Sequence, residues 1–135
     1  MLAVFFSSFH LSEFIDPTGT YTLKGNVERN IIKGLNGQIK AKLFTENKLA
    51  LSYHVDSGFP DYKKAVFTDT IFYDGNEARY HSVKDDDCTI VFKFSKDAVN
   101  ILLIHTDPGC TCGYEKGLIV PVSFEKNSSD VPFIR

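Results

Sequence analysis

The amino-acid sequence predicts an all-β domain, an antiparallel up-and-down barrel of about eight strands. Three observations predict this fold. Apolar and polar residues alternate with a period of two in most apolar segments, as they do in strands that bury one face. Turn signals separate these segments at short intervals, which is typical of a meander of strands. Aromatic residues make up 13% of the 135 residues, and they are all Phe and Tyr, whose rings pack well across pleated sheets.

The expected strands follow one another along the chain with short connections. They are residues 19–25, 37–43, 49–55, 65–73, 77–82, 88–94, 99–105 and 117–124. In the third of them, Leu51, Tyr53 and Val55 alternate with the polar Ser52 and His54. Such strands most simply close into a barrel, because closure removes exposed sheet edges. A two-sheet sandwich is the structural alternative.

Other segments complete the expected organisation of the chain. Residues 27–35 are the only expected helix within the domain. Residues 1–15 form a short N-terminal segment of helical or extended structure, residues 16–126 the barrel domain and residues 127–135 a polar tail. The start of the chain is apolar like a signal-peptide core, but it lacks a basic region and a clear cleavage site. It is therefore either a signal remnant or, slightly favoured, a segment packed on the barrel end.

Composition and motifs exclude several functional classes. The net charge of -2 does not fit the basic surface that nucleic-acid binding requires. No segment is long and apolar enough to cross a membrane. No Ser or Cys lies in a nucleophile-elbow sequence, no Gly-rich loop leads into a helix, and the acidic run 85–87 lacks the spacing of a calcium loop. We therefore expect a protein that is not an enzyme and has no cofactor.

The three cysteines indicate a disulfide. Cys88 begins an expected strand and Cys112 lies in the loop before the last one, so two neighbouring strand ends could bring them within bonding reach. The bond would close a loop of about 25 residues and stabilise the fold by about 3 kcal/mol. The alternative is a metal site that adds Cys110 and His105, but a closed zinc site normally takes cysteines from two separate pairs. We expect the disulfide, no metal, and a periplasmic or secreted protein.

The longest polar loop, residues 56–63, is the candidate binding loop. It carries Ser57, Gly58, Phe59 and Tyr62, and Pro60 stiffens it. Exposed aromatic residues on a rigid loop are typical of recognition sites. The alternative, somewhat favoured, is that Phe59 folds over the barrel mouth as a cap.

The barrel interior is the second candidate site. A carrier of a small apolar ligand would line its cavity with inward residues such as Leu51, Tyr53, Phe92 and Ile101. Large inward side chains could instead fill a barrel of this size completely.

Residues 37–126, about two-thirds of the chain, resemble small secreted bacterial proteins with a calycin-like (lipocalin-like) barrel. The residues that carry the resemblance are Cys88-x-Ile90-x-Phe92-x-Phe94, Val99-x-Ile101, Cys112-Gly113-Tyr114, Gly117 and the strand that ends at Phe124. In that group the two cysteines pair. The resemblance therefore implies a calycin-like barrel, a bond between Cys88 and Cys112, and export.

The loop sequence is also similar to that of the periplasmic and membrane-bound lysozyme inhibitors. Those proteins insert a Ser-Gly-x-x-Tyr loop into the lysozyme cleft. Here Ser57-Gly58-Phe59-Pro60-Asp61-Tyr62 is one residue longer, and their second motif, a Tyr followed by Thr-Lys-Gly, has no counterpart. The resemblance implies an exported binding protein with a lysozyme-like partner, and Ser57, Gly58 and Tyr62 as its contact residues. The alternative function is the carrier of a small apolar ligand.

Overall fold

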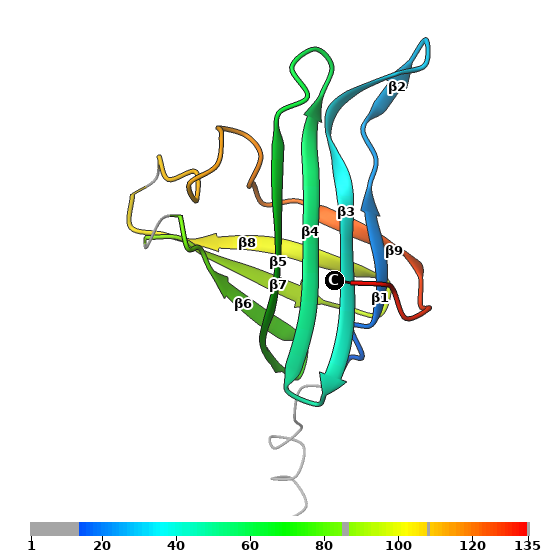
Figure 1. Ribbon diagram of the computed structural model, residues 1–135, viewed down its shortest axis with the longest axis vertical. Helices are drawn as coiled ribbons and strands as arrows, with labels where there is room; N and C mark the ends of the chain where they lie inside the picture. Colours follow the sequence, from blue (N-terminus) through cyan, green and yellow to red (C-terminus); the bar gives the residue numbers. More distant parts are fainter. Residues whose placement is uncertain (1–13, 85–86, 108, 135) are drawn as a thin grey trace, which may run out of the picture.

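Nine strands form one antiparallel sheet in the computed structural model, which describes residues 14–84, 87–107 and 109–134 (Figure 1). The strands are β1 (Gly19–Leu23), β2 (Asn26–Glu28), β3 (Ile31–Thr45), β4 (Lys48–Gly58), β5 (Lys64–Asp74), β6 (Glu77–His81), β7 (Thr89–Phe94), β8 (Ala98–Ile104) and β9 (Ser123–Ser128). Pairing of β1 with β3 closes eight of them into a barrel, and β2 is an additional strand beside β3. The predicted all-β barrel is confirmed.

The strands cross the barrel in two directions. In Figure 1 the long strands β3, β4 and β5 run vertically, and β7, β8 and β9 cross behind them. Strand β4 pairs with β5 at nine register positions, from Lys48 with Phe72 to Asp56 with Lys64.

None of the described residues forms a helix, so this part of the chain holds no helix that could span a membrane.

The helix expected over residues 27–35 is wrong. This segment belongs to a hairpin in which β2 pairs with the start of β3, with Val27 opposite Ile32. The chain reverses at Arg29 and Asn30, which have φ values of 50° and 66°. Two successive residues with positive φ are the requirement of a type I′ hairpin turn, whose twist matches that of the flanking strands. The β-branched residues of the segment therefore lie in strands, where Val27 and Ile32 are exposed.

The last strand begins later than expected. Residues 117–122 form no strand, and β9 starts at Ser123 and continues through Ser128, two residues into the expected polar tail. The apolar Leu118 and Ile119 are nevertheless buried in the core. Pro121 has no N–H to donate to a strand ladder. The Val122 carbonyl accepts from the Ile101 N–H at 2.8 Å, and residues 117–122 otherwise contribute side chains to the core outside the named strands. The strand expected over residues 117–124 is therefore confirmed only at residues 123 and 124, and the adjacent Leu118 and Ile119 are both buried, which is not a strand-like alternation.

The barrel interior is packed with aromatic side chains. The Tyr53 ring lies 5.0 Å from the Phe67 ring, 6.1 Å from that of Phe92 and 6.0 Å from that of Phe124, measured between centroids. Its hydroxyl donates to the Leu118 carbonyl at 3.3 Å. Burial raises the pKa of Tyr53 well above its ordinary value and so favours the protonated hydroxyl that donates this bond. The four residues named for a cavity all belong to this core: Leu51, Tyr53, Phe92 and Ile101.

Residues 14–18 lead into β1, the first strand of the barrel. The Phe14 ring meets the Tyr73 ring edge-on at 6.0 Å, and the Tyr73 hydroxyl donates to the Ile15 carbonyl at 2.6 Å. Residues 1–13 of the expected N-terminal segment lie outside the described residues. Residues 14 and 15 therefore cover one end of the barrel, and the candidate binding loop lies at the other end.

Candidate functional site

The candidate binding loop projects from the same end of the barrel as the β2–β3 hairpin (Figure 1). Two backbone hydrogen bonds define its shape. The N–H of Phe59 donates to the Ile32 carbonyl at 2.8 Å, and the N–H of Tyr62 donates to the Gly58 carbonyl at 2.9 Å. An isolated parallel bridge between Lys33 and Phe59 adds to this contact. The hairpin therefore supports the loop from the side.

Side chains at both ends of the loop hold its backbone. The Asp56 carboxylate accepts from the Gly58 N–H at 2.7 Å and from the Asn36 side-chain amide at 3.0 Å. The Ser57 hydroxyl accepts from the Lys63 N–H at 3.0 Å, and the Ser57 N–H donates to the Lys63 carbonyl at 2.9 Å. The loop is thus clamped where it leaves β4 and where it returns to β5.

Asp56 and Asn36 are anchors that sequence reasoning missed. The Asp56-Ser57-Gly58 sequence matches an Asx turn, in which the carboxylate accepts from the N–H two residues later. That signal was readable in the sequence. The contribution of Asn36 was not, because it lies 20 residues away and depends on the pairing of β3 with β4.

Gly58 fits a space that no side chain could enter. Its φ is 74°, and it is buried at the end of β4. A Cβ atom there would lie 2.8 Å from the carbonyl oxygens of both Gly34 and Ile32. The close approach of the loop to the hairpin therefore requires glycine at this position.

Alanine substitutions at two glycines distinguish the cost of backbone strain from the cost of this close contact. Gly58→Ala and Gly75→Ala share the penalty of a positive φ, because the φ of Gly75 is 65°. A Cβ at Gly75 meets nothing within 4 Å. We expect Gly58→Ala to lower the free energy of unfolding by about 2 kcal/mol more than Gly75→Ala in urea titrations. Equal losses in the two variants would contradict the tight contact between loop and hairpin.

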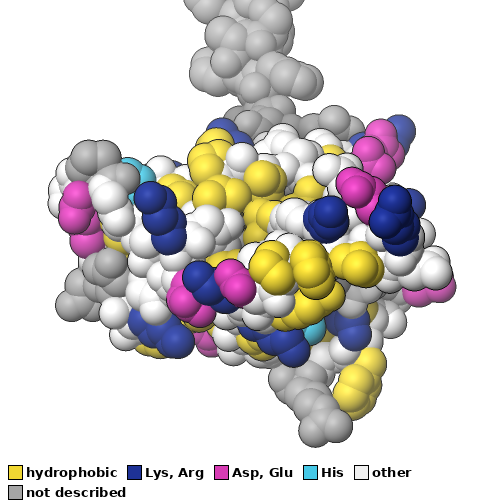
Figure 2. Space-filling view, turned by 90° about the horizontal axis from the view of Figure 1, so that it is seen from above, with side chains coloured by type: hydrophobic (Ala, Val, Ile, Leu, Met, Phe, Trp, Pro, Cys, Tyr) yellow, Lys and Arg dark blue, Asp and Glu magenta, His cyan; other side chains and the backbone are white. Residues whose placement is uncertain are grey.

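Four exposed hydrophobic residues lie on the β2–β3 hairpin and the candidate binding loop at this end of the molecule, and we call them the apolar tip: Val27, Ile32, Phe59 and Tyr62. Phe59 is 45% exposed and Tyr62 is 49% exposed, and their rings meet edge-on at 6.4 Å. Seen from above, hydrophobic side chains gather across the middle of this face, with charged side chains around them (Figure 2). Phe59 is therefore exposed and does not belong to the barrel core.

A small groove adjoins the apolar tip. It has a volume of about 250 Å³, and Leu23, Val27 and Ile32 contribute its apolar lining. Beside the tip, the Lys63 ammonium pairs with the Glu115 carboxylate at 3.5 Å. Exposed ion pairs of this kind contribute little stability. The tip and groove together form a surface suited to binding an apolar partner segment.

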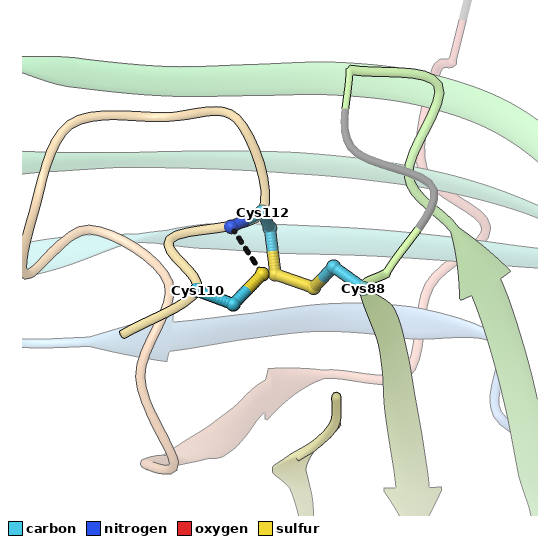
Figure 3. Close-up of side chains that lie close together, drawn as sticks. All are labelled: Cys88, Cys110 and Cys112. Atoms are coloured by element: carbon cyan, nitrogen blue, oxygen red, sulfur yellow. Dashed lines mark hydrogen bonds between the residues drawn. A yellow bond between two sulfur atoms is a disulfide. The ribbon is translucent and has the colours of Figure 1, made fainter. Parts of the chain in front are cut away.

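The disulfide between Cys88 and Cys112 is present, as predicted. It joins the start of β7 to the loop before β9, with 5.1 Å between the two Cα atoms. The Ser82 hydroxyl donates to the Cys112 carbonyl at 2.9 Å and holds the same loop. The Cys110 sulfur lies close to the bond, and all three side chains converge (Figure 3). His105 is not part of this cluster, so the four groups considered for a metal are not brought together.

Comparison with known proteins leaves the site to be judged from its geometry. No protein-family model, no curated protein and no solved structure matches this chain. The assignment of the candidate site therefore rests on the loop, the hairpin and the exposed side chains described above.

Proposed function

We propose that this protein is a non-enzymatic binding protein that recognises a protein partner through the apolar tip. The observation that carries the proposal is the half-exposure of Phe59 and Tyr62 on a loop whose backbone is hydrogen-bonded at both ends. A loop that is already ordered loses little conformational entropy on binding. Aromatic side chains held in this way are suited to insertion into a partner's cleft.

The mechanism is steric. The projecting loop would occupy the partner's cleft, and no covalent step is involved. Lysozyme is the most concrete partner, because Ser57, Gly58 and Tyr62 match part of the loop motif of the lysozyme inhibitors. In this protein the Ser57 hydroxyl is engaged with the Lys63 N–H, so Phe59 and Tyr62 are the side chains offered to the partner.

The disulfide supports a periplasmic or secreted location for this binding protein. Disulfides persist in oxidising compartments and are rare where thiol reductants are abundant. Cys88 and Cys112 are both fully buried in the core, which shields their bond from soluble reductants.

The packed interior of the barrel favours binding through the apolar tip over the alternative function, a carrier of a small apolar ligand. A carrier would need open space among Leu51, Tyr53, Phe92 and Ile101. These side chains are almost completely buried, and the Tyr53 ring is in contact with the Phe92 ring. Side chains therefore occupy the space that a ligand would take.

Inhibition of lysozyme tests the proposal directly. The purified protein is mixed in increasing excess with lysozymes of the chicken, goose and invertebrate types, and the lysis of bacterial cell walls is followed. We expect inhibition of at least one type, with binding of the same enzyme measured by calorimetry. Full activity of all three types in excess protein would exclude a lysozyme inhibitor.

Removing both aromatic side chains from the tip should abolish the interaction. We expect Phe59→Ala/Tyr62→Ala to weaken binding of the inhibited lysozyme by about a hundredfold, because exposed aromatic anchors carry most of the energy of such interfaces. The matched control is Phe72→Ala, which removes a 64% exposed ring near the opposite end of β5. Affinity is measured by calorimetry. Equal affinities of the double variant and the control would place the binding surface elsewhere.

A further inference from the structure

Three sulfur atoms lie together at the loop before β9. The sulfurs of Cys88, Cys110 and Cys112 are all within 4.8 Å of one another, and their side chains converge (Figure 3). The Cys112 N–H donates to the Cys110 sulfur at 3.4 Å. Cys88 and Cys112 are buried, whereas Cys110 is partly accessible. A thiol is therefore held against a disulfide within the same chain.

Hydrogen bonds fix the backbone that carries Cys110. The Asp87 carboxylate, directly before Cys88, accepts from the Thr106 hydroxyl at 2.6 Å and from the Asp107 N–H at 3.0 Å. The hydrogen bonds from Thr106 and Asp107 lower the pKa of Asp87, because they stabilise its charged carboxylate. Asp107 in turn accepts from the Cys110 N–H at 2.9 Å through its carbonyl. This chain of contacts ties the Cys110 turn to the start of β7.

We propose that Cys110 and the Cys88–Cys112 bond form a thiol–disulfide exchange site. The Cys110 thiolate attacks the Cys112 sulfur and forms a new Cys110–Cys112 bond. The Cys88–Cys112 bond breaks, and its electron pair leaves with the Cys88 sulfur as a thiolate. That thiolate takes up one proton from solvent, which replaces the proton lost by Cys110. One thiol and one disulfide are present before and after, so no oxidant or reductant is consumed.

The position of the Cys110 sulfur favours attack on Cys112. The hydrogen bond from the Cys112 N–H holds the two residues together, and only Thr111 separates them in the chain. The exchange releases Cys88, so the covalent link between β7 and the loop opens. The Ser82 and Tyr53 hydroxyls still hold this loop through the carbonyls of Cys112 and Leu118. The exchange thus converts a covalently linked loop into one held by these hydrogen bonds and by the buried side chains of Leu118 and Ile119.

Peptide mapping of the whole protein tests the exchange. Trypsin cleaves after lysine, so Cys88 is recovered in residues 85–93, and Cys110 and Cys112 are recovered together in residues 97–116. The oxidised protein is incubated without reductant at about pH 8, where thiolates form, and portions are quenched in acid. Each portion is denatured, its thiols are labelled with a maleimide, and the labelled peptides are identified by mass spectrometry.

The exchanged form has a distinct signature in this map. We expect a labelled 85–93 peptide and an internal disulfide in 97–116, both increasing with time at alkaline pH. If the disulfide still links peptides 85–93 and 97–116 at every time point and only Cys110 carries the label, the proposal is overturned. Linked peptides with the label on Cys112 would also overturn it, because the attack would then be on Cys88.

Two variants show whether the position of the thiol matters. Cys110→Ser keeps the disulfide and should yield no labelled 85–93 peptide. Cys110→Ser/Asn100→Cys places a thiol on exposed Asn100, within the same tryptic peptide and on the far part of β8. We expect release of Cys88 in this variant to be slower than in the natural protein by roughly tenfold or more. Equal rates would mean general scrambling and would overturn the proposed site.

Discussion

Replacing Phe92 by alanine is expected to lower the free energy of unfolding by about 4 kcal/mol. Phe92 is fully buried, and its ring lies 6.1 Å from the Tyr53 ring and 6.5 Å from the Phe67 ring. Truncation would remove these contacts and leave a cavity among the other rings, which cannot close without moving the strands. The loss is measured by urea unfolding, followed by circular dichroism.

The control for this prediction is the same substitution on the outside of the barrel. Phe72 is 64% exposed on β5, so Phe72→Ala should change the free energy of unfolding by no more than about 0.5 kcal/mol. Comparable losses in the two variants would contradict the assignment of Phe92 to the interior.

Reduction of the disulfide is expected to destabilise the protein by about 3 kcal/mol. The bond links residues 24 positions apart, and its main effect is to restrict the unfolded chain. The effect is isolated in a Cys110→Ala protein, because no other thiol can then exchange with the bond. Urea unfolding of the oxidised and reduced forms of this one sequence gives the difference.

A variant without cysteines controls for the reductant. Cys88→Ala/Cys110→Ala/Cys112→Ala should unfold at the same urea concentration with and without reductant. An oxidised Cys110→Ala protein that is no more stable than its reduced form would show that the bond is not a stabilising clasp.

The strands with a local alternating pattern were predictable from the sequence. In β4, Leu51, Tyr53 and Val55 point into the core, as their spacing indicated. In β7, Ile90 and Phe92 do the same. A period of two is visible within a few residues, so neither strand needs knowledge of its neighbours to be recognised.

The β2–β3 hairpin was not predictable in the same way. Its turn, Arg29-Asn30, contains no glycine and resembles a polar position of a helix. Only the pairing of Val27 with Ile32 shows that the segment folds back on itself. The hairpin then positions the Ile32 carbonyl, which accepts from the Phe59 N–H. Because a helix was expected over residues 27–35, the hairpin that supports the candidate binding loop was not predicted.

The candidate binding loop was likewise predictable only in part. Ser57, Gly58, Phe59 and Tyr62 were identified from the residue types of one loop. The backbone of Phe59 is held by the Ile32 carbonyl of the hairpin, and Asp56 at the start of the loop is held by Asn36, which lies in β3. These contacts join residues that are far apart in the chain.

Patterns in the amino-acid sequence were enough to predict the all-β class, the order of most strands and the two cysteines of the disulfide. The strands follow from local alternation, and the choice of Cys88 and Cys112 follows from the expected strand ends together with the resemblance to the calycin-like group. Two features became visible only in the folded protein. Phe59 and Tyr62 are exposed at the same end as Val27 and Ile32, and the Cys110 sulfur lies against the disulfide. The physical reason is that local periodicity is set by neighbours in the chain, whereas these clusters are set by strand register and barrel closure.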